Sequence, residues 1–97
     1  MAKNFGFDAA LLFMKDGEKV RRAGWNGKGM WICLGAGQED LPAEKFWNKH
    51  TNAFAAANGG TADVLPYFIM KTADNKILMG WLASQSDMVA DDWEVAL

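Results

Sequence analysis

The chain has 97 residues, a length that suits one small domain, here expected to span residues 1–97, with a modest core. Hydrophobic residues make up 51% and charged residues 23% of the chain, as in globular proteins, which excludes disordered and collagen-like classes. A net charge of −2 with scattered basic residues argues against nucleic acid as a partner, and the lack of a long apolar run argues against a membrane span.

Residues 6–15 are expected to form the first helix. Apolar residues recur there at helical spacing, namely Phe7, Ala10, Leu11 and Met14. Gly17 follows soon after Lys15, which predicts the end of the helix.

A hairpin is expected next, with strands over residues 19–25 and 30–34 joined by an Asn-Gly turn at 26–27. Asn-Gly is the strongest short hairpin signal because both residues tolerate a positive φ. Arg21 and Arg22 must point to opposite faces of the first strand, so only one of them can face any given pocket. The second strand contains no polar residue, which predicts that both of its faces are covered.

Large aromatic residues flank this turn. Trp25 and Trp31 could close one edge of the core, or they could form a wall for a flat ligand. Trp81 and Trp93 supply two more aromatic faces on which a base could stack.

The middle of the chain is expected to form a second helix over residues 42–57. Pro42 suits the first turn of a helix, where its missing N–H costs little, and the Asn-Gly-Gly run at 58–60 predicts the end.

The last third of the chain predicts mainly strands. A second hairpin is expected over residues 67–73 and 77–82, and Ser84 and Asp87 have the spacing of a capping box that opens a short helical turn. A closing strand over 93–97 completes the prediction. The fold class is therefore α+β, a small twisted antiparallel sheet of about five strands with an N-terminal helix and a mid-chain helix packed on it.

The sequence offers no convincing catalytic constellation. His50 has no partner at metal-ligand spacing, and Cys33 lies in an apolar strand without a basic neighbour along the chain. The Asp91-Asp92 pair is expected in a solvated loop, and residues 24–29 lack P-loop spacing. We therefore expect a protein that is not an enzyme and that has no catalytic residues, metal site or cofactor.

Polar residues near the predicted turns could serve a ligand. Groups that could contact a base or ribose are Asn26, Ser84, Gln85 and Asp87. Arg22 and Lys28 could hold phosphates. Each of these residues also has a structural explanation as a turn former, a helix cap or a solvated hairpin tip.

Two signatures carry a family resemblance. Residues 19–30 resemble the opening motif of the second Thoeris anti-defence family of phage proteins, formerly a domain of unknown function. Residues 70–74, 81–88 and 91–94 resemble its closing motifs in order and spacing.

The resemblance implies a sponge that binds the cyclic ADP-ribose isomer made by the Thoeris TIR enzyme, and in some members cyclic dinucleotides, without cleaving them. It also implies a homotetramer with ligand pockets where subunits meet, with a homodimer as second choice. The expected helix over 42–57 is a departure, since many members carry a proline-containing segment there that closes on the pocket.

Site residues are carried over from the matching motifs. Trp25 is expected to stack on a base with Asn26 nearby, and the second wall is expected to contain Ser84, Gln85, Asp87 and Met88. Arg22, Lys28 and Trp31 complete the expected ligand-binding set.

A second hypothesis is a protein-interaction module of phage or prophage origin with no nucleotide ligand. Five tryptophans and six methionines are many for this length, and such residues are enriched at interfaces. The lone Cys33 and the lack of a signal-peptide pattern suggest a reducing compartment, which under the family reading is the bacterial host cytoplasm.

Overall fold

The structure is a computed structural model that describes residues 4–97, and it falls into two compact units. The sheet unit comprises the chain up to Gly35 together with Tyr67–Leu97, and the hairpin unit comprises Ala36–Pro66. The two units are described separately below.

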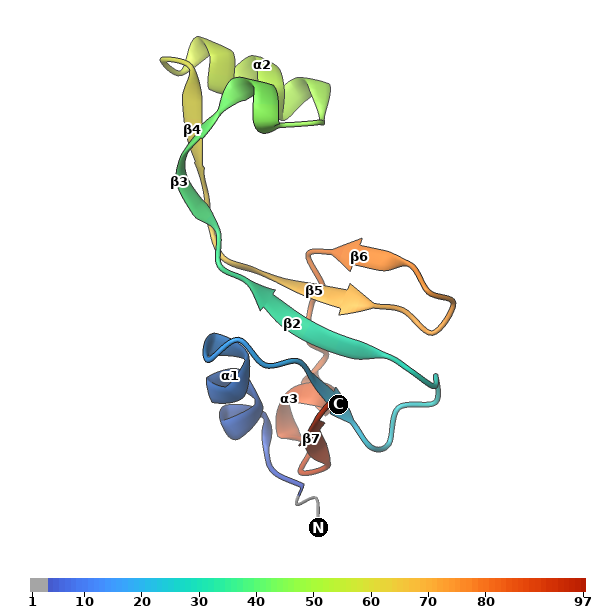
Figure 1. Ribbon diagram of the computed structural model, residues 1–97. Helices are drawn as coiled ribbons and strands as arrows, with labels where there is room; N and C mark the ends of the chain where they lie inside the picture. Colours follow the sequence, from blue (N-terminus) through green and yellow to red (C-terminus); the bar gives the residue numbers. More distant parts are fainter. Residues whose placement is uncertain (1–3) are drawn as a thin grey trace. The chain divides into compact units, whose positions relative to one another are not determined.

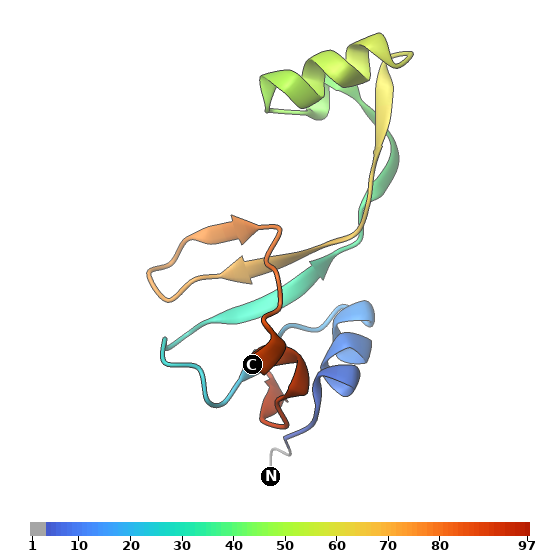
Figure 2. The same ribbon diagram turned by 180° about the vertical axis from the view of Figure 1, so that it is seen from behind.

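The sheet unit is built on a five-stranded antiparallel sheet with the order β6-β5-β2-β1-β7 (Figure 1). Its strands are β1 (Val20–Arg22), β2 (Trp31–Gly35), β5 (Tyr67–Lys71), β6 (Ile77–Met79) and β7 (Trp93–Val95). Its helices are α1 (Phe7–Lys15) and α3 (Gln85–Val89), which lie beside each other in both views (Figure 2). This arrangement confirms the predicted α+β class, the first helix, the second hairpin and the closing strand.

The core of the sheet unit lies between α1 and one face of the sheet. Val20 pairs with Ile32, and Ile32 pairs with Met70, so these side chains form a row across three strands. They pack with Ala10 and Met14 of α1 and with the fully buried Trp93. The predicted helical spacing of α1 is thus explained by the face that it buries.

The first hairpin forms, but its connection differs from the prediction. Residues 23–30 join β1 to β2, and a positive φ occurs at Gly29 (75°) and at neither residue of the Asn-Gly pair. The two-residue turn was therefore the wrong assignment. The strand ends at Arg22 because Ala23 N–H donates to the Asp92 carbonyl (2.9 Å) and the chain then turns, with Trp25 N–H donating to the Arg22 carbonyl (3.3 Å).

Strand β2 is less covered than predicted. Ile32 is buried, whereas Trp31 and Cys33, which point to the opposite face, are only partly buried. The apolar run therefore reflects one core face and one half-exposed aromatic face.

The hairpin unit contains β3 (Gln38–Pro42), the short 3₁₀ helix η1 (Ala43–Lys45), α2 (Lys49–Ala57) and β4 (Thr61–Val64) (Figure 1). The predicted helix over 42–57 is wrong in its first part, because Pro42 ends a strand paired with Thr61 and the α-helix begins only at Lys49. Asn48 caps α2, since its side-chain oxygen accepts from the N–H groups of His50 (2.9 Å) and Thr51 (3.3 Å).

Strand pairing in the hairpin unit is interrupted by a bulge between Gln38 and Leu41. Asp40 adopts a positive φ of 53° there, and its N–H donates to the Asp63 side chain at 2.9 Å. None of the helices within residues 4–97 has the length and apolar character needed to cross a membrane.

Candidate functional site

The most connected polar group in the sheet unit is the guanidinium of Arg22. Arg22 shares the core face with its pairing partner Trp93, so its charge lies beside buried apolar residues and needs compensation. Its Nε donates to Asp92 (2.8 Å) and its second branch to Asp87 (2.9 Å). Asp92 also accepts from the Gly24 N–H (2.8 Å), so the expected solvated loop is instead an anchor for the segment after β1.

Asp87 is the buried centre of this network. The capping box predicted from the sequence is confirmed, because Asp87 N–H donates to the Ser84 side chain (3.1 Å) and Ser84 N–H donates to the Asp87 carboxylate (3.2 Å). The same carboxylate accepts from Arg22 and from the indole N–H of Trp25 (3.2 Å). One helix cap therefore fixes both a charge and an aromatic ring.

The network shifts the titration of its members. Burial opposes ionisation of Asp87, but hydrogen bonds from Arg22, Ser84 and Trp25 outweigh burial and hold its pKa below the usual 3.8. The Arg22 hydrogen bond is the largest cause that lowers the pKa of Asp92. Asp92 and then Asp87 in turn raise the pKa of Arg22.

Trp25 is part of an aromatic cluster. Its ring meets Trp93 edge-on at 5.4 Å between centroids and Trp81 edge-on at 6.2 Å, and its indole N–H is already used by Asp87. The ring is only partly buried, so it packs on the core while keeping accessible surface.

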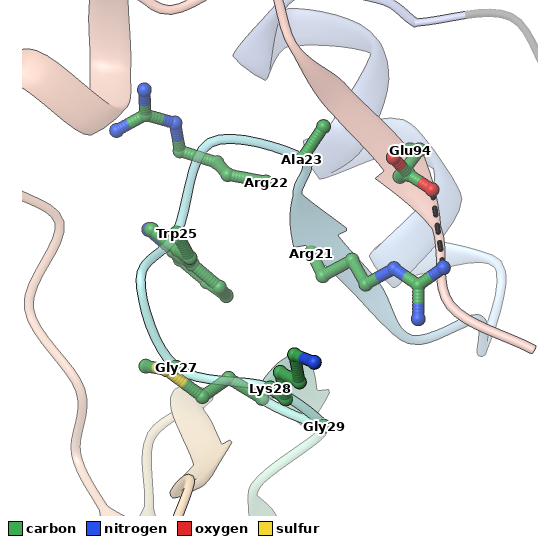
Figure 3. Close-up of a pocket in the computed structure, with 9 residues that line it drawn as sticks. Arg21, Arg22, Ala23, Trp25, Gly27, Lys28, Gly29 and Glu94 are labelled. Atoms are coloured by element: carbon green, nitrogen blue, oxygen red, sulfur yellow. Dashed lines mark hydrogen bonds and ion pairs between the residues drawn. The ribbon is translucent and has the colours of Figure 1, made fainter.

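That surface borders a hollow of about 360 Å³ on the loop between β1 and β2 (Figure 3). The hollow is lined by Arg21, Arg22, Ala23, Trp25, Gly27, Lys28, Gly29, Met30 and Glu94. Figure 3 shows the Arg22 guanidinium directed away from Arg21, as expected for neighbours on opposite faces of a strand.

Arg21 and Glu94 form an ion pair at the rim of the hollow. They are register partners on β1 and β7, and their side chains meet at 3.2 Å between nitrogen and oxygen. The pair lies on the sheet face opposite Trp93. It is more exposed than the Arg22 network, with 41% of the Arg21 side chain accessible.

Residues 5–96 match the Thoeris anti-defense 2-like (Tad2-like) domain family. The chain is also 35% identical over 98 residues to Thoeris anti-defense 2 of Bacillus phage SP01, with 98% of each protein covered. The chain belongs to the Tad2-like family. Membership confirms the resemblance seen in the two signatures and supports an anti-defence role.

The structure brings some of the sequence-predicted site residues together within this Tad2-like fold. Arg22, Trp25, Ser84 and Asp87 form one network, and Lys28 joins Trp25 at the hollow.

Other predicted site residues lie apart from that network. Asn26, Gln85 and Met88 are exposed. Trp31 is partly buried on the sheet face opposite Ile32, where the Lys19 ammonium lies 5.0 Å from its ring centre.

Sequence reasoning missed three residues at this site. Arg21, Met30 and Glu94 line the hollow. The alternation of side chains along β1 was the available signal for Arg21, but which arginine faces the hollow depends on the pairing of β1 with β7.

Other candidate chemistry is not assembled. Burial raises the pKa of the Cys33 thiol, and Lys19 offsets this only in part, so the thiol is a poor nucleophile. His50 is exposed on α2. Among the described residues, no group of His, Cys, Asp and Glu has the arrangement of a metal site.

Proposed function

We propose that the protein binds and sequesters a cyclic nucleotide signal of bacterial immunity without cleaving it. The proposed ligand is the cyclic ADP-ribose isomer of the Thoeris system, with cyclic dinucleotides as further candidates. The observation that carries the proposal is the hollow in which the accessible surface of Trp25 meets Arg21 and Lys28, in a chain of the Tad2-like family.

The lining of the hollow suits the two halves of such a ligand. An indole offers a face for a base, and stacking of this kind contributes about 1–3 kcal/mol per base. Arg21 and Lys28 offer positive charge for phosphates (Figure 3). Asp87 would then act by holding Trp25, since its carboxylate is already bound to Arg22, Ser84 and Trp25.

We further propose that the protein acts as a homotetramer, with a homodimer as second choice, in the bacterial host cytoplasm. The hollow is open and lies near the lower end of ligand-pocket volumes, about 300–1,000 Å³, so a second copy could complete it. Large apolar side chains are exposed in both units, including Leu12, Trp47, Phe54, Ile77 and Met79. Light scattering that reports a 10.7 kDa particle at micromolar concentration would contradict assembly.

The test of sequestration is recovery of the ligand. The purified protein is mixed with the product of the Thoeris TIR enzyme, separated from free ligand, and denatured by heat. We expect mass spectrometry of the supernatant to return the ligand intact and in a fixed ratio to protein. A hydrolysed or linearised product would show an enzyme.

The second candidate function is a protein-interaction module without a nucleotide ligand. The observation that favours it is in the hairpin unit, where Trp47 is 93% exposed and Phe54 and Leu65 are also exposed. Calorimetric titrations with cyclic ADP-ribose isomers and cyclic dinucleotides that give neither heat nor a thermal shift would favour this function over the first.

A further inference from the structure

Two adjacent arginines of β1 have opposite environments. Arg22 donates to both Asp87 and Asp92, and 20% of its side chain is accessible. Its positive charge is therefore matched by two carboxylates of the protein. A ligand anion that approached Arg22 would have to displace them.

Arg21 is held much more loosely. Within residues 4–97 its guanidinium makes one side-chain hydrogen bond, to Glu94 at 3.2 Å, and 41% of the side chain is accessible. A guanidinium has five N–H donors in a planar fork that matches phosphate, so most of its donors stay available. Arg21 also lines the hollow directly (Figure 3).

Positive charge gathers around Arg21 at the loop. Lys28 lines the same hollow, and the Lys71 ammonium donates to the Gly29 carbonyl at 3.0 Å, beside that lining. Gly29 has a positive φ of 75°, which gives the loop the shape that brings its carbonyl to Lys71. Glu94 is the carboxylate among the lining residues.

We propose that Arg21, and not Arg22, is the arginine that binds the anionic groups of the ligand, and that Glu94 competes with the ligand for its guanidinium. This inference rests on the proposed function, and it assigns the phosphate-binding part of the same hollow. Arg22 and Asp87 are positioning residues that hold Trp25 and the loop.

The exchange of partners has a physical basis. An exposed ion pair contributes little by itself because water and salt screen it, so Arg21 can leave Glu94 at small cost. A phosphate accepts two parallel hydrogen bonds from a guanidinium, whereas the structure gives the Arg21–Glu94 pair a single one. Removing Glu94 should therefore strengthen ligand binding, which distinguishes this role from a structural ion pair.

The experiment compares Arg21→Gln, Glu94→Gln and a charge control, Lys15→Gln, which removes an exposed positive charge at the end of α1. Affinity for the TIR product is measured by calorimetry at low and high salt, beside thermal unfolding. We expect Arg21→Gln to weaken binding about tenfold or more and to flatten its salt dependence. We expect Glu94→Gln to tighten binding about two- to fivefold, and Lys15→Gln to leave it unchanged.

The inference is overturned if Arg21→Gln binds as tightly as the parent protein with the same salt dependence, or if Glu94→Gln weakens binding in a folded protein. Failure of the proposed function gives a different result, in which the parent protein binds no nucleotide. Inorganic pyrophosphate then tests the anion site directly. Binding of pyrophosphate that is lost in Arg21→Gln supports the assignment of Arg21, and binding that is equal in both proteins overturns it.

Discussion

The sheet unit and the hairpin unit are stabilised in different ways. The sheet unit buries a cluster that runs from Met14 through Val20 and Ile32 to Trp93, and it fixes its functional loop with the Arg22–Asp87 network. In the hairpin unit, Ala55 is the one buried hydrophobic residue among those described. That unit depends instead on strand pairing, a helix cap at Asn48 and a bulge, which are local backbone interactions.

The contrast suggests a division of roles. A densely packed unit can hold a ring and charged groups in fixed positions, as a binding site requires. A unit with little buried apolar surface opens at lower free energy and leaves its aromatic residues available for contacts. The following experiments test this difference, from the largest expected effect to the smallest.

Trp93→Ala should cause the largest loss of stability. Trp93 is fully buried, packs against Phe7 and Trp25, and donates its indole N–H to the Asp87 carbonyl at 2.9 Å. Truncation of a buried aromatic residue costs about 3–5 kcal/mol, a large part of the stability of a small domain. Urea unfolding measures this loss, and Trp47→Ala in the hairpin unit is the matched control, expected to change stability by less than about 0.5 kcal/mol. Equal losses would refute the contrast between the units.

Trp25→Ala should damage binding more than stability. The ring is partly buried, so its loss should cost less unfolding free energy than Trp93→Ala, while binding of a stacked base should weaken by about 1–3 kcal/mol, or roughly 5- to 150-fold. Melting temperature and ligand affinity are measured on the same preparation. Ile32→Ala serves as a core control that harms stability first. A folded Trp25→Ala fraction that binds normally would exclude the stacking role.

Acid should destabilise the sheet unit through Asp87 and Asp92. Both carboxyls have a lower pKa in the folded protein than the usual 3.8, so folding favours their ionised forms. Their contribution to stability is complete above pH 3.8 and is lost as the pH falls through the lowered pKa values of the folded state. Urea unfolding between pH 7 and pH 3 should therefore show a smaller acid-induced loss for Asp87→Asn than for the parent protein. An identical pH profile in the two proteins would contradict the role of Asp87.

Asn48→Ala should have the smallest effect and should stay within the hairpin unit. Loss of the cap leaves the N–H groups of His50 and Thr51 without their side-chain acceptor and costs about 1 kcal/mol of helix stability. Amide hydrogen exchange should speed up in α2 and not in β2 or β5. Lys49→Ala, at an exposed neighbouring position, is the control. Faster exchange throughout the sheet unit would show that the two units open together.

Local patterns explain why much of the sheet unit was predictable. The apolar spacing of α1, the second hairpin around Asn75, whose φ is 65°, and the Ser84–Asp87 capping box all depend on residues close together in the chain. The prediction over 42–57 failed because alanine-rich sequence has high helix propensity, whereas the residues before Asn48 are decided by pairing with β4, a partner further along the chain.

The sequence by itself determined the family, the fold class and the rule that Arg21 and Arg22 face opposite sides of β1. Only the tertiary structure decided which arginine meets Asp87 and which meets Glu94, because that choice follows from the register of β1 against β7. It also decided that Trp25 both packs on Trp93 and borders the hollow. The physical reason is range, since helix caps and strand alternation act between near neighbours, whereas the electrostatic partner of an arginine on β1 comes from residues near the other end of the chain.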